Sequence, residues 1–98
     1  MHPYQRQIDL CGEALEAVRS SIPPDLFRDV DDYINRFDEW GLGMEVLIDQ
    51  LGELDIVISP EQFDLIRAAM DSIGQGESDR LAHLRTHGVS RPPESPAS

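Results

Sequence analysis

The chain has 98 residues, which is enough for one domain with a single hydrophobic core. It carries 19 acidic and 8 basic residues, for a formal net charge of −11, and every basic residue is an arginine. Because such a charge is repelled by phosphates, we expect neither nucleic acid nor an anionic membrane as a partner. No apolar run approaches the roughly 20 residues of a membrane-spanning helix.

The N-terminus and the single cysteine bear on the cellular compartment. Residues 1–7 are polar and lack the pattern of a secretory signal, so a cytoplasmic location is the default expectation. Cys11 has no partner for an internal disulfide. Its place on an apolar helical stripe predicts a buried structural thiol rather than a nucleophile.

Two amphipathic helices are predicted in the first part of the chain. A helix over residues 4–20 has an apolar stripe at spacings of four and three residues, formed by Tyr4, Ile8, Cys11, Leu15, Val18 and Ile22. Pro23 and Pro24 end it, and Pro24 suits the first turn of a second helix that extends to about Arg36. The inward face of the second helix is formed by Leu26, Phe27, Val30, Tyr33, Ile34 and Phe37.

The middle of the chain predicts a corner, a third helix and an extended connection. Gly41 and Gly43 favour a tight corner over residues 38–43. The third helix extends from about Leu42 to Leu54, with an apolar face formed by Met44, Leu47, Ile48, Leu51 and Leu54. The run 55–58, whose last three residues are β-branched, is too short for a helix. We expect it to place its apolar side chains beneath the bundle, with no partner strand apparent.

A fourth helix has the clearest start signal in the sequence. Ser59 is its cap, Pro60 its first residue, and Gln62 occupies the capping-box position, while Gly74 ends the helix. The expected fold is all-α: a compact antiparallel bundle of four main helices, with room for a short fifth over 77–86. One domain spans residues 1–88 with its core over 4–74. Residues 89–98, rich in proline and serine, are predicted to be a disordered tail.

No common signature of catalysis or of cofactor binding is present. The chain lacks a nucleophile elbow, a phosphate-binding glycine loop and a zinc-protease motif, so we expect no catalytic residue and no cofactor. His83 and His87 are four residues apart and would share a helical face, as zinc ligands do, but no third ligand has suitable spacing. We therefore expect a protein that is not an enzyme and has no metal site.

Acidic side chains mark the predicted partner-binding face. Asp25, Asp29 and Asp32 recur at spacings of four and three residues on the second helix. Like charges at such spacings destabilise a helix by a few tenths of a kcal/mol each, a cost that a basic partner would relieve. Tyr33 and Trp40 are candidate aromatic anchors, although packing in the core is favoured for Trp40. The predicted partner-binding set is Asp29, Asp32, Tyr33, Asp38, Glu39, Trp40, Glu45 and Asp49.

The stretch from Val30 to Ile73 resembles the MafI-type immunity proteins of bacterial polymorphic toxin systems. The resemblance rests on Asp31-Asp32-Tyr33-Ile34, the run Glu39 to Glu45, Leu47, Asp49-Gln50-Leu51, Glu53, Asp55-Ile56, Ile58 to Glu61, Phe63 and Ile66. Gly43 and Met44 depart from it, because alanine and leucine are expected there in the family.

The resemblance implies a small helical protein that neutralises the C-terminal domain of a cognate toxin, often a nuclease. An acidic helical face suits that role, since it can occupy a basic cleft in place of nucleic acid. One alternative is an acidic scaffold or regulatory subunit that binds a basic host protein. A second alternative is an enzyme whose carboxylates converge on Mg²⁺.

Overall fold

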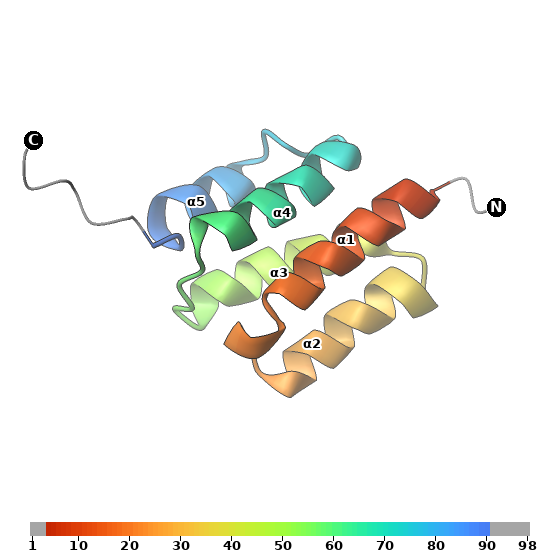
Figure 1. Ribbon diagram of the computed structural model, residues 1–98, viewed down its shortest axis with the longest axis horizontal. Coiled ribbons are helices and arrows are strands. Elements are labelled where there is room, and N and C mark those ends of the chain that lie inside the picture. Colours follow the sequence, from red (N-terminus) through yellow and green to blue (C-terminus); the bar gives the residue numbers. More distant parts are fainter. Residues whose placement is uncertain (1–3, 91–98) are drawn as a thin grey trace, which may run out of the picture.

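A computed structural model describes residues 4–90 of the chain, and Figure 1 shows how they are arranged. The described residues form an all-α bundle, which confirms the predicted four main helices and a short fifth. The helices are α1 (Gln5–Ala17), α2 (Pro24–Asp31), α3 (Trp40–Glu53), α4 (Pro60–Ser72) and α5 (Asp79–His87). A 3₁₀ turn, η1 (Arg19–Ser21), follows α1, and a π-helical turn, η2 (Asp32–Arg36), continues α2.

The apolar stripes of the five helices meet in one core. α1 packs mainly on α4, and the two lie side by side in front of α3, which also contacts α2, η2 and α5 (Figure 1). The largest fully buried side chains are Leu15, Ile34, Met44, Leu47, Leu51, Ile58, Ile66, Met70 and Leu81, and Cys11 is buried with them as predicted. Among residues 4–90 no polar or charged side chain is buried. The charges of this acidic chain therefore lie on its surface.

The capping signals of the later helices are confirmed. The Ser59 hydroxyl accepts a hydrogen bond from the Gln62 backbone N–H, and the Gln62 side chain accepts one from the Ser59 backbone N–H. The amide nitrogen of Gln62 also donates to the Ala17 carbonyl at 2.8 Å, which ties the start of α4 to the end of α1. Gly74 has a φ of +79°, the left-handed conformation expected of a residue that ends a helix.

The two ends of the α2 region differ from the predictions. α1 ends at Ala17 instead of residue 20, because Val18 leaves the α-helical conformation and the next three residues form the 3₁₀ turn η1. Ile22, which precedes Pro23, is extended and ends that turn. At the other end, α3 begins at Trp40, so Gly41 and Gly43 lie in its first turns and not in a corner. The reversal of direction is made instead at Asp38, whose φ is +53°.

The connection between α3 and α4 is only partly tucked under the bundle. Ile58 is buried, but Val57 is 58% exposed, because side chains alternate between faces along an extended segment. Ile58 pairs in parallel with Val89: its N–H donates to the Gly88 carbonyl and its carbonyl accepts from the Ser90 N–H, both at 2.8 Å. The predicted tail therefore does not begin at Val89, and its residues 91–98 lie outside the described part of the chain.

Within residues 4–90, no helix is both long enough and apolar enough to cross a membrane.

Candidate partner-binding surface

The acidic residues predicted on the second helix lie on the surface of α2 and η2. Asp29 is exposed and Asp32 is half-buried, and neither is paired with an arginine within residues 4–90. Asp25 differs, because its carboxylate lies 2.6 Å from the Arg28 guanidinium one turn along the same helix. The predicted stripe is thus compensated at its first position and uncompensated at the next two.

The two predicted carboxylates of α3 lie on a different flank. Arg80 of α5 donates from Nε to Asp49 Oδ1 at 2.6 Å, and its Nη1 lies 3.5 Å from Glu45 Oε1. The hydrogen bond with Asp49 raises the pKa of the Arg80 guanidinium. Gly43 faces η2, and a step of two residues turns a helix by about 200°, so Glu45 points away from η2. The structure therefore does not bring all the predicted carboxylates into one patch.

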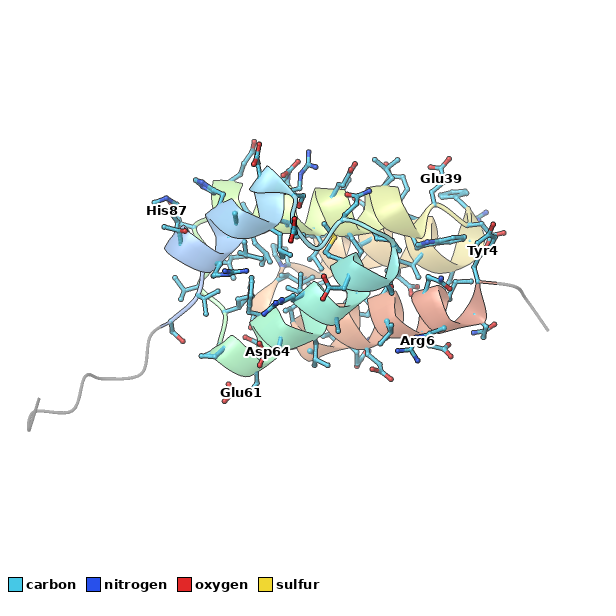
Figure 2. All side chains as sticks on the ribbon, turned by 90° about the horizontal axis from the view of Figure 1, so that it is seen from above. Tyr4, Arg6, Glu39, Glu61, Asp64 and His87 are labelled. Carbon is cyan, nitrogen blue, oxygen red and sulfur yellow. The ribbon has the colours of Figure 1, made fainter. Side chains whose placement is uncertain are left out.

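Aromatic side chains gather at one end of the bundle, where α1 and α3 begin and η2 ends. The Tyr4 and Trp40 rings lie 5.1 Å apart between centroids, and the Tyr33 and Phe37 rings lie 6.2 Å apart. Tyr4 is 49% exposed and Phe37 is 54% exposed, while Tyr33 and Trp40 are half-buried. We name these four residues, with Asp38 and Glu39, the aromatic end; Figure 2 shows Tyr4 and Glu39 at this end of the molecule.

The backbone fixes the acidic rim of the aromatic end. The Phe37 N–H donates to the Asp32 carbonyl and closes η2, and the Glu39 N–H donates to the Tyr33 carbonyl at 2.7 Å. These bonds hold Asp38 in its left-handed conformation, so the Asp38 and Glu39 side chains project on the outside of the reversal. Both are exposed, and neither is paired with an arginine in the described part of the chain.

Charge alone does not single out this end, because uncompensated carboxylates occur over much of the surface. What distinguishes it is exposed aromatic area beside carboxylates, a combination typical of the energetically important centre of an interface. The Arg36 guanidinium carbon lies 5.7 Å from the Phe37 ring centroid, so a ring at this end already accepts a guanidinium neighbour. The arrangement is suited to binding cationic side chains.

The remaining candidates for metal binding or for catalysis are a pair of histidines and one cysteine. His83 and His87 lie on α5 with ring centroids 4.5 Å apart, but no cluster of three or more metal-ligating residues is found among residues 4–90. Burial raises the pKa of the Cys11 thiol to about 11, which keeps it protonated at neutral pH.

Two features of this surface were not predicted from sequence. The sequence places Tyr4 and Phe37 on apolar faces, but each is about half exposed. Both lie at helix ends, where the neighbouring helices no longer cover them. Arg80 has no predicted role, because nothing in the local sequence places it beside Asp49, 31 residues earlier. Only the packing of α5 on α3 brings these residues together.

Comparison of the chain with models of protein families, with curated proteins and with solved structures found no match.

Proposed function

We propose that this protein is an immunity protein that binds a toxin domain of a polymorphic toxin system in the cytoplasm of the producing cell. The observation that carries the proposal is the aromatic end, where Tyr4, Phe37 and Trp40 present ring surface beside the carboxylates of Asp38 and Glu39. The resemblance of residues 30–73 to MafI-type immunity proteins points to the same role. The protein acts by binding and not by catalysis.

The physical basis of neutralisation is charge and shape complementarity. A nuclease toxin holds phosphates in a basic cleft, and a surface of carboxylates and aromatic rings can fill such a cleft. Arginine stacks on aromatic faces and pairs with carboxylates, so it is the toxin side chain that this end is best suited to receive. Asp29 and Asp32 extend the negative surface along α2 and would speed association by electrostatic steering.

Co-expression with the C-terminal domain of a neighbouring toxin-like reading frame tests the proposal. We expect the wild-type protein to rescue growth and to co-purify with that domain. The double substitution Asp38→Asn and Glu39→Gln should weaken both effects. Glu61→Gln with Asp64→Asn is the matched control, because it removes the same charge from α4, away from the aromatic end (Figure 2).

The possible outcomes separate the candidate functions. Rescue that depends on the aromatic end supports the immunity role. Failure of every neighbouring toxin-like domain to bind would overturn it and favour the acidic scaffold for a basic host protein. Equal loss in the two double variants would show that overall charge, and not this end of the bundle, carries recognition.

A further inference from the structure

A groove lies between the C-terminal half of α3, the connection to α4, and α5, and it includes none of the residues of the aromatic end. Its volume is about 580 Å³, within the roughly 300–1,000 Å³ typical of sites that receive a ligand. Its floor is apolar, formed by Ile48, Leu51 and Leu84. One wall comes from α5 and the other from the end of α3 and the segment that follows it.

The charges around the groove are unbalanced. Its lining includes the carboxylates of Asp49, Glu53 and Asp55, the guanidinium of Arg80, and the imidazoles of His83 and His87. With histidine counted as neutral at pH 7, the lining holds three negative charges against one positive charge. Arg80 already forms ion pairs with Asp49 and with Glu45, so it does not neutralise the other two carboxylates. Glu53 and Asp55 are exposed, and neither has an arginine partner within residues 4–90. The groove therefore presents negative charge beside an apolar floor.

The rim of the groove adds exposed apolar surface to these charges. Val57 lines it and is 58% exposed, and Leu54, adjacent to Glu53 and Asp55 in the chain, is 46% exposed. An apolar side chain that entered the groove would cover the floor and the rim together. A cation next to that side chain would reach the two free carboxylates.

We propose that the groove is a second docking site, for a protein segment that places an apolar side chain beside lysine or arginine. Charge complementarity selects this occupant: an acidic segment would be repelled by Glu53 and Asp55, and a second copy of the chain would bring its own charge of −11. The inference depends on the groove alone and does not require the partner to be a toxin.

The proposal is tested by the binding of a short amphipathic peptide of leucine and lysine. Isothermal titration calorimetry measures its affinity, and the NMR chemical shifts of the backbone amides locate its binding site. The same peptide with glutamate in place of lysine is the probe control. We expect only the lysine peptide to bind, with the largest shifts at Gly52, Val57 and Gly88. We expect Glu53→Gln with Asp55→Asn to weaken binding by about fivefold or more. Asparagine at position 55 tolerates the φ of +53° found there.

The matched control is Asp9→Asn with Glu13→Gln, which removes the same charge from exposed positions on α1, a helix that contributes no residue to the groove lining. We expect this variant to bind the lysine peptide within about twofold of the wild type. Equal weakening by both double variants, shifts confined to other surfaces, or no binding of the lysine peptide would each overturn the proposal. Because no toxin is present in this experiment, its failure leaves the proposed immunity function untouched, and failure of the co-expression test leaves the groove untouched.

Discussion

Gly43 of α3 meets Tyr33 of η2 so closely that a Cβ atom at position 43 would lie 3.0 Å from the Tyr33 Cβ. The same atom would lie 3.3 Å from Ile34 Cγ1 and 3.4 Å from the Val30 carbonyl oxygen. α3 can therefore approach η2 only where it has no side chain. This contact positions the residues on both sides of the aromatic end, because Tyr33 belongs to one helix and Trp40 begins the other.

Replacing this glycine by alanine should destabilise the protein. In Gly43→Ala, crowding against Tyr33 outweighs the roughly 1 kcal/mol that alanine gains in a helix, so we expect a net loss of about 1 kcal/mol. Gly12 in α1 is the control, since nothing lies within 4 Å of its added Cβ, and Gly12→Ala should stabilise by about 0.5–1 kcal/mol. Urea unfolding measures both, and a stabilised Gly43→Ala variant would contradict the close packing described here.

The Gln62 side chain has two roles that one substitution can separate. In Gln62→Glu the carboxylate still accepts from the Ser59 N–H, but it cannot donate to the Ala17 carbonyl. Glutamate is as good as glutamine in a capping box. A decrease of about 1–2 kcal/mol in the free energy of unfolding would therefore measure the lost hydrogen bond between α4 and α1. Ser59→Ala is the comparison, because it removes the cap and keeps that tie. Unchanged stability of Gln62→Glu would show that the link to Ala17 contributes nothing.

The buried thiol of Cys11 predicts a stability change in alkali. Its pKa is raised from 9.0 to about 11, so the folded protein holds the proton more tightly than the unfolded chain. The protonated thiol therefore adds to the free energy of unfolding at any pH below 9, and this addition is lost as the pH rises toward 11. The loss amounts to up to about 3 kcal/mol. The free energies of unfolding of the wild type and of Cys11→Ala should therefore converge as the pH rises across this range. Parallel curves would show that the thiol titrates normally.

Arg80 should couple α5 to α3 through Asp49. Both side chains are partly exposed, so solvent screening limits the expected coupling to about 0.5–1 kcal/mol in a double-mutant cycle with Arg80→Ala and Asp49→Ala. The coupling should shrink in 1 M salt, which screens surface charges over about 3 Å. Arg28 and Asp25, which are more exposed and lie within one helix, provide a reference pair with weaker coupling. If the effects of Arg80→Ala and Asp49→Ala on stability are additive, the two side chains do not couple α5 to α3.

The sequence predicted those parts of the fold that depend on local patterns. Apolar spacing identified the buried faces of α1, α3 and α4, and the Ser59 and Gln62 signal located the start of α4 to the residue. Contacts between distant segments were beyond such patterns. The sequence predicts a corner at Gly43, whereas the structure shows that this glycine is needed because Tyr33 of η2 leaves no room for a side chain there. In the same way, the partners of Val89 and Arg80 depend on how α5 folds back onto the bundle, which no local spacing records.

Partner binding should depend on the two groups of predicted carboxylates to different degrees. Within residues 4–90, Asp29 and Asp32 form no ion pair with an arginine, whereas Glu45 and Asp49 already share Arg80. If the partner is the proposed basic toxin domain, Asp29→Asn with Asp32→Asn should weaken its capture more than Glu45→Gln with Asp49→Asn does. The first variant should also flatten the salt dependence of binding more than the second. The measurement is the association rate of each variant with the partner at salt concentrations from low to physiological. Both double variants remove two negative charges, so they are compared at equal net charge. A larger effect from the Glu45 and Asp49 variant would instead place the toxin on the α5 flank, in competition with Arg80.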